Sequence, residues 1–347
     1  MDTIRRCLCG WTITLTALAV TGAVFAQPEP PQRQGFEERV KAIASSFKSN
    51  PSLKKLPQTQ LENLMNFMVG NMLFILNHEM AHVIINDFHL PVLGQEEDAA
   101  DDLAIVTSLR SGTDFSHRVI EEAAKGWFLS ELRDRDDKVA IFYFSDHRLD
   151  LQRAYRIVCL MVGSDPVKFK EFADITKLPE PRQETCKDDY EKAVSGWDTL
   201  LKPFERGLDQ PKIKIDVTYG DGKGEYDLFA WGFRSVRLLD VVAARLANEL
   251  VWPLPFALEM QTCGSDNATW NESTRKLTLC YELAADFAEL YRSYNDKLIA
   301  SANPIPKQSQ SQSQSENRLR EPLKALGWRP DSTLRSDWGS HASVRHQ

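Results

Sequence analysis

Residues 61–85 read LENLMNFMVGNMLFILNHEMAHVII. Apolar side chains recur in this stretch at helical spacing, and such spacing predicts one long helix with an apolar face. The side chains that carry the pattern are Leu61, Leu64, Phe67, Met68, Met72, Ile75 and Leu76. Pro91 and Gly94 interrupt the pattern, and a second helix is expected from Glu96 to about Leu109. The chain is therefore expected to fold back on itself between these two helices.

Helical patterns dominate the rest of the chain, over 36–58, 116–132, 147–162, 234–250 and from Glu282 to about Tyr294. Strict alternation over residues 212–219, a Gly-Asp-Gly turn and the apolar run 226–233 together predict a hairpin. Two further short strands, 256–262 and 276–281, are joined by a loop rich in Gly and Asn. The expected fold class is α+β, mainly helical, with small antiparallel β elements.

Composition narrows the function classes. The 347 residues include 42 basic and 49 acidic side chains, for a net charge of −7. A nucleic-acid-binding surface needs clustered Lys and Arg, and no long basic run is present, so no nucleic acid is expected as a partner.

The two ends of the chain differ from its middle. Residues 1–26 carry two Arg, an apolar stretch and small residues before a cleavage site after Ala26, which is typical of an export signal. We expect a helical segment over 27–58, a main domain over 59–300 and a disordered Ser/Gln-rich tail over 301–347. The tail's partner is not specified. No stable membrane span is expected after signal cleavage, so the mature protein should be periplasmic or secreted.

The cysteines fit an oxidising compartment. Six are present, two of them inside the predicted signal, which leaves Cys159, Cys186, Cys263 and Cys280. An even number in an exported chain predicts disulfides, with three possible connectivities. We expect the local pairs, Cys159–Cys186 and Cys263–Cys280. Because no CxxC is present, a zinc site made of cysteines is not expected.

The end of the first helix carries a candidate metal-binding motif. His78-Glu79-Met80-Ala81-His82 has the pattern HExxH. Residues four apart lie on one helix face, so both imidazoles reach one metal ion, and Glu79 lies beside that ion where it takes a proton from water. A satisfied core histidine is the alternative for a single His, but two His and one Glu in this register favour a metal site.

A third ligand is expected from the second helix. Glu97 stands fifteen residues after His82, in the run Glu97-Asp98-Ala99-Ala100-Asp101. Zinc sites with two His and one carboxylate leave a position open for water. Asp101 lies on the same face as Glu97, where it accepts the remaining ring N–H of a ligating His. Glu96 and Asp98 are rivals for the ligand role, and a solvated acidic helix start is the alternative for the whole run.

These motifs together resemble the gluzincin branch of the zinc metallopeptidases. More narrowly, HEMAHVIINDFHLPVLGQEEDAADDLA (residues 78–104) is similar to a family of predicted exported bacterial metallopeptidases named only as a domain of unknown function. The resemblance covers about residues 60–295. It includes SDHRLDLQR (145–153) and a later segment with Cys263-Gly264, Asn267-Ala268 and Cys280-Tyr281-Glu282-Leu283, which usually precedes the HExxH helix in that family.

The resemblance implies zincin-like active-site helices, with zinc held by His78, His82 and Glu97. It also implies that Glu79 is the general base and that Asp101 supports a ligating His. A donor to the oxyanion is needed besides zinc. The candidates are His147, Arg153 and Tyr155, on a helix expected to begin after Asp146, with Tyr281 as a weaker one. A charged surface helix capped by Asp146 is the alternative for this segment.

The expected function is that of a zinc metallopeptidase, a hydrolase of peptide bonds outside the cytoplasm, in which Glu79 is the base for a zinc-activated water. Its partner would be a peptide or protein substrate. The alternative is a non-catalytic exported module that binds zinc or another protein on a metallopeptidase scaffold.

Overall fold

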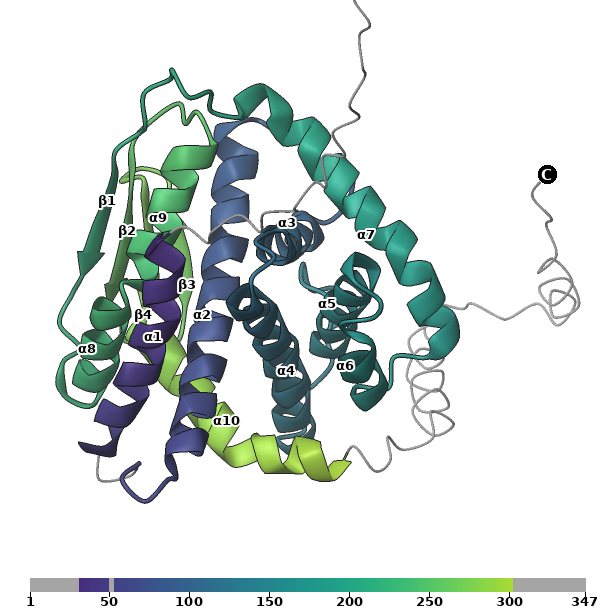
Figure 1. Cartoon of the computed structure of the whole chain (residues 1–347), viewed down its shortest axis with the longest axis vertical. Helices are drawn as coiled ribbons and strands as arrows, with labels where there is room; N and C mark the ends of the chain where they lie inside the picture. The colour runs from purple at the N-terminus through teal and green to yellow at the C-terminus, as the bar shows by residue number, and fades with distance from the viewer. Residues whose placement is uncertain (1–30, 50–52, 302–347) are drawn as a thin grey trace, which may run out of the picture.

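One long helix, α2 (Gln58–Asp87), runs through the middle of the molecule (Figure 1). The structure, a computed structural model, describes residues 31–49 and 53–301. The predicted signal sequence and nearly all of the predicted tail lie outside these residues. In Figure 1, the sheet with α1 (Pro31–Ser46) lies on one side of α2, and most of the other helices lie on the opposite side. Helix α2 therefore contributes to the packing on both sides.

Helix α2 is apolar around most of its circumference. By length and composition it could cross a membrane, but 78% of its most apolar stretch is buried inside the fold. A helix that is apolar on all sides and buried by protein is a core helix. The long helix expected over 61–85 is present and begins three residues earlier than expected.

The two largest apolar cores meet at α2. The larger one includes α1, α2, the sheet and the helices next to it, and the second lies among the helices that follow α2, with Phe74 contributed by α2. The N-terminal helical segment packs into the larger core through buried Phe36, Val40 and Phe47. Its Arg39 also donates to the Val236 carbonyl, 3.2 Å away. This segment is thus part of the main fold.

The helices after α2 surround the second core. They are α3 (Glu96–Arg110), α4 (Asp114–Asp136), α5 (Asp150–Ser164), α6 (Lys170–Ile175) and α7 (Glu180–Leu201). Helices α6 and α7 were not predicted. Most side chains of α7 are exposed, and only Cys186 and Trp197 are buried, so its apolar pattern is too sparse to stand out in the sequence.

The remaining elements build the sheet side and close the fold. Three short 3₁₀ turns, η1 (Phe47–Ser49), η2 (Lys202–Phe204) and η3 (Gly224–Tyr226), connect the longer elements. The others are β1 (Ile215–Tyr219), α8 (Asp227–Val236), α9 (Leu238–Glu249), β2 (Phe256–Gln261), β3 (Ala268–Asn271), β4 (Lys276–Cys280) and α10 (Tyr281–Ser301). Helix α10 packs on both α2 and α4.

The sheet is mixed, which corrects the expectation of antiparallel elements. Its strand order is β1-β2-β4-β3; β1, β2 and β4 are parallel, and only β3 is antiparallel to its neighbour. The hairpin expected at 226–233 is wrong because this segment is helix α8. Its buried residues Ala230, Phe233 and Val236 recur every third position, which is a helical spacing. Parallel strands need a crossover, and α8 and α9 form the one between β1 and β2.

Both disulfides join the cysteines expected from local pairing. Cys159–Cys186 links α5 to α7, and Cys263–Cys280 links the loop after β2 to the end of β4. The helices α5 and α7 approach each other closely at the first disulfide, and there is no room for a side chain at position 163, which is Gly163. A Cβ at Gly163 would lie 2.2 Å from the Cys186 carbonyl oxygen.

This close approach predicts opposite effects for two Gly→Ala substitutions. We expect Gly163→Ala to lower the free energy of unfolding by about 1–3 kcal/mol, because the helix backbones must separate. Gly196→Ala on α7 is the matched control, since a Cβ there meets nothing within 4 Å. It should raise the free energy of unfolding by about 0.5–1 kcal/mol. Urea denaturation of both variants measures the difference, and equal effects would contradict the packing described here.

Candidate metal centre

Two histidines of α2 face the same point. His78 and His82 are four residues apart, one helical turn, and their ring centroids lie 4.9 Å apart. The Nε2 atoms of the two rings are 3.2 Å apart. The His78 side chain is nearly buried, whereas that of His82 is 21% exposed, so the point where they meet is reached from solvent.

Helix α3 brings Glu97 to the same point. Its Oε2 lies 3.1 Å from His78 Nε2 and 3.4 Å from His82 Nε2. Three ligand atoms bound at about 2.0–2.1 Å to a tetrahedral metal ion such as zinc lie about 3.3 Å from one another. The three atoms therefore form a triangle of the size that one such ion requires.

The other ring nitrogens are held by carboxylates. His78 Nδ1 lies 2.8 Å from Asp101 Oδ1, and His82 Nδ1 lies 2.8 Å from Glu96 Oε1. An ionised carboxylate only accepts hydrogen bonds, so each Nδ1 carries the proton and each Nε2 of a neutral ring has a free lone pair. Two lone pairs and the Glu97 oxygen then point at one another. This arrangement needs a positive charge between them, which a bound metal ion would supply.

The pKa values of the two histidines and of Glu97 also indicate that the site stabilises positive charge. Burial alone lowers the pKa of His78, but hydrogen bonds with Asp101 and Glu97 outweigh it and raise the pKa. His82 is likewise opposed by burial, yet hydrogen bonds with Glu97 and Glu96 raise its pKa to about 9. Burial raises the pKa of Glu97, but hydrogen bonds from both histidines pull it well below its usual range. The site thus favours cations.

Asp101 is itself held from behind by Arg153. The guanidinium donates from Nε to Oδ2 at 2.8 Å and from Nη2 to Oδ1 at 2.7 Å, and both side chains are buried. Burial raises the pKa of Asp101, but hydrogen bonds from His78 and Arg153 lower it below its usual value. Arg153 also lies over the Trp127 ring, 3.7 Å from its centroid. The resulting chain Trp127–Arg153–Asp101–His78 fixes the ring orientation of His78.

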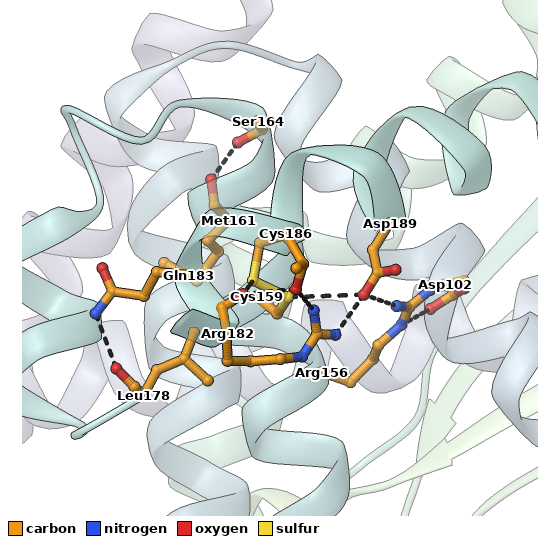
Figure 2. Close-up of a disulfide and its surroundings, with 11 residues drawn as sticks. Asp102, Arg156, Cys159, Met161, Ser164, Leu178, Arg182, Gln183, Cys186 and Asp189 are labelled. Carbon is orange, nitrogen blue, oxygen red and sulfur yellow. Dashed lines mark hydrogen bonds and ion pairs between the residues drawn. A yellow bond between two sulfur atoms is a disulfide. The ribbon is translucent and has the colours of Figure 1, made fainter. Parts of the chain in front are cut away.

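Similar ion pairs connect α3, α5 and α7. Arg156 of α5 donates to both carboxylate oxygens of Asp102 at 2.8 and 2.6 Å, and its Nη1 lies 3.4 Å from Asp189 of α7. Arg182 reaches Asp189 as well, beside the Cys159–Cys186 disulfide (Figure 2). Helix α3 is thereby tied to a covalently linked pair of helices.

Glu79 lies next to the triangle but outside it. None of the described residues donates a hydrogen bond to its carboxylate, whose surroundings act on it through burial and through the charges of His78 and His82. Burial raises the pKa of Glu79 above its usual value. A partly buried carboxylate with no fixed donor is suited to accept a proton from a water molecule beside the metal position.

His147 also reaches the centre, although not from a helix. Its Nε2 lies 2.8 Å from Glu97 Oε2, and its side chain is half exposed. The helix expected after Asp146 begins at Asp150 instead, with Leu149 as its N-cap residue, so the alternative of a surface helix capped by Asp146 is wrong. His147 lies in the loop between α4 and α5. The atoms of His78, Glu97 and His147 lie within 4.8 Å of one another, close enough for one ion.

The tyrosine candidates lie elsewhere. The Tyr155 hydroxyl donates to the Thr176 carbonyl at 3.0 Å, and that of Tyr281 donates to the Gly220 carbonyl at 3.0 Å. The Tyr155 ring packs against Phe128 at the second core. Both hydroxyls are thus bonded to backbone carbonyls, and in the described structure neither contacts a residue of the metal centre.

Two residues of the centre did not stand out in the sequence. Glu96 was considered only as a rival ligand, yet it holds His82 as Asp101 holds His78. The sequence does contain a signal for this role. Glu96 follows His82 by fourteen residues, at the point where the turn brings α3 back to α2. Trp127 gave no signal, because its contact with Arg153 joins two helices that are separate in sequence.

The buried pair behind His78 predicts a loss of metal affinity on mutation. We expect Arg153→Ala to weaken zinc binding about 10–100-fold, because Asp101 would no longer be held against His78. Arg156→Ala is the matched control. Arg156 donates two hydrogen bonds to Asp102, as Arg153 does to Asp101, but no described histidine contacts Asp102. Competition with a chromophoric chelator measures the affinity. Equal losses in both variants would show that the Arg153 contact is not special to the centre.

Comparison with known proteins agrees with this geometry. Residues 31–201 match the family described as "Putative metallopeptidase". All the residues that meet at the centre lie in this range, and the sheet lies outside it. Among curated proteins none matches the chain, and among solved structures none matches it either.

Proposed function

We propose that this chain, whose residues 31–201 match that family, is a zinc-dependent peptidase that acts outside the cytoplasm. The observation that carries the proposal is the triangle of His78 Nε2, His82 Nε2 and Glu97 Oε2, with sides of 3.1, 3.2 and 3.4 Å. The donor set of two imidazoles and one carboxylate is that of catalytic zinc sites, which leave one position open.

The chain's own residues divide the chemistry among them. Zinc, when bound, lowers the pKa of a water molecule and polarises the carbonyl group of the substrate. Glu79 accepts the proton of the attacking water and then transfers it to the leaving amine. Asp101 and Glu96 keep both imidazoles in the orientation in which Nε2 faces the centre. His147, which lies on the exposed side of Glu97, is the candidate donor to the oxyanion.

A peptide substrate finds a docking edge beside this site. Strand β3 is the last strand of the sheet, so its outer edge has no partner among the described strands. Asn86 lies one helical turn beyond His82 on the same face of α2 and donates to Glu272, just after β3, at 2.7 Å. An extended peptide that pairs with β3 would therefore pass next to the metal position.

The two disulfides support a location outside the cytoplasm, because such bonds persist in oxidising compartments. The expected signal sequence over residues 1–26 would account for export to the periplasm or the medium.

Replacement of Glu79 tests the mechanism. We expect Glu79→Gln to lower kcat for peptide hydrolysis by a factor of about 100–10,000, because the amide cannot accept the proton. Zinc content should stay at one ion per chain, as Glu79 is outside the ligand triangle. Glu62→Gln on the same helix is the matched control and should leave hydrolysis unchanged. Elemental analysis and a fluorogenic peptide assay give both readouts, and full activity in Glu79→Gln would refute the role of this residue.

The position of His147 favours a second candidate function, a closed and non-catalytic zinc site. Four protein ligands around zinc are typical of structural sites. His147 is close enough to Glu97 and His78 to be the fourth ligand. The chain would then be an exported zinc-binding module on a metallopeptidase scaffold.

Mutation of His147 separates the two functions. If His147 acts on the oxyanion, His147→Ala should retain zinc with nearly unchanged affinity and lose about 100-fold in kcat. If His147 is a ligand, the variant should bind zinc at least about tenfold more weakly, and the wild type should hydrolyse no peptide. Measurement of zinc affinity together with hydrolysis of a mixed peptide set distinguishes these outcomes.

A further inference from the structure

The loop between α4 and α5 exposes an unusual run of apolar side chains. Residues 139–144 read VAIFYF, and we call them the apolar loop. Ile141, Phe142, Tyr143 and Phe144 are 52%, 55%, 65% and 85% exposed. Single exposed apolar residues are ordinary, but a contiguous apolar patch on a protein surface marks an interaction site.

The apolar loop is attached to the metal centre. Only Ser145 and Asp146 separate Phe144 from His147, whose Nε2 lies 2.8 Å from Glu97 Oε2. Three residues of extended chain span at most about 10–11 Å, so Phe144 lies within that reach of His147. Arg148 adds a second attachment through its ion pair with Asp98. The apolar loop is therefore held within about 10–11 Å of a histidine that contacts the ligand Glu97.

The charges around the apolar loop disfavour a membrane as its partner. Binding to an anionic lipid surface needs clustered Lys and Arg next to the apolar residues. Asp136, Asp137 and Asp146 flank the loop, against Lys138 and Arg148, and Arg148 is paired with Asp98. The aromatic rings also contact each other, with the Phe142 and Phe144 centroids 5.5 Å apart, and so present a joint apolar surface.

We infer that the apolar loop binds a large apolar side chain of the peptide substrate next to the bond that is cleaved. This inference rests on the proposed peptidase function and deepens it by naming the substrate class, which is peptides with Phe, Leu, Tyr or a similar residue beside that bond. Aromatic side chains bury much apolar area with few rotatable bonds, so a ring pair at the rim of a site gives selectivity at a small entropic penalty.

The test compares the zinc-loaded full chain with two variants. Phe142→Ser/Phe144→Ser removes the ring pair, and Leu208→Ser is the matched control, because Leu208 is 94% exposed and lies in the loop after η2. A mixture of synthetic peptides with every residue type around a central bond is digested, and the cut sites are identified by mass spectrometry. A fluorogenic peptide with Phe beside the cleaved bond is then compared with its Ala counterpart.

We expect the wild type and Leu208→Ser to cut beside large apolar residues. The double variant should raise KM for the Phe peptide about tenfold, leave kcat nearly unchanged and leave the Ala peptide unaffected. Equal KM values for wild type and double variant would overturn the inference. Co-sedimentation of the wild type with phosphatidylcholine or phosphatidylglycerol vesicles, lost in the double variant while KM stays constant, would identify a membrane as the partner instead and would also overturn it.

A binding assay separates failure of this inference from failure of the proposed function. Fluorescence anisotropy of the labelled Phe peptide with zinc-loaded Glu79→Gln measures binding without turnover. Binding that falls about tenfold when the two Phe residues are replaced supports the inference even if the wild type hydrolyses nothing. Hydrolysis that does not depend on the loop supports the peptidase function and rejects the inference.

Discussion

Three electron-rich atoms meet at one point in this protein, and their mutual repulsion must be balanced by a positive charge. The Nε2 atoms of His78 and His82 and the Oε2 atom of Glu97 can face one another because carboxylates hold both Nδ1 atoms. The three acids that contact the two imidazoles, Glu96, Glu97 and Asp101, come from the first two turns of α3. The positive end of the helix dipole partly offsets their repulsion there. A bound cation would complete the balance, so metal binding and the packing of α3 on α2 would stabilise each other.

The position of α3 depends on contacts that lie outside the centre. Arg153 and Arg156 of α5 each donate two hydrogen bonds to a carboxylate of α3. Helix α5 is in turn bonded to α7 by Cys159–Cys186, next to the shared acceptor Asp189 (Figure 2). These ion pairs and the disulfide hold the ligand side chains in place before a metal binds. A site ordered in advance loses less conformational entropy on binding.

The sequence was informative where the contacts are local. The spacing of His78 and His82 places them on one helix face whatever the rest of the chain does. The approach of Glu97 and Asp101 to these histidines is also predictable from the sequence, because a short turn returns α3 to α2. The contact between Arg153 and Asp101 joins residues fifty-two positions apart, and no spacing rule reports such a pair. The prediction of the sheet's strand pairing was wrong for the same reason. Its parallel pairing is set by strands far apart in sequence, whereas the turn after β1 suggested a local hairpin.

The carboxylate of Glu79 bears on whether this centre does chemistry. A closed structural site gains nothing from a partly buried acid that has no hydrogen-bond donor among the described residues. Burial of such a group without a partner is unfavourable, and an apolar residue at this position of α2 would stabilise the core instead. An acid in this place becomes useful only when a proton must be moved beside the metal position. The raised pKa of Glu79, caused first by burial, makes the carboxylate a stronger base for that step. The unfavourable burial of Glu79 therefore favours the proposed catalytic centre over a metal site that only supports the fold.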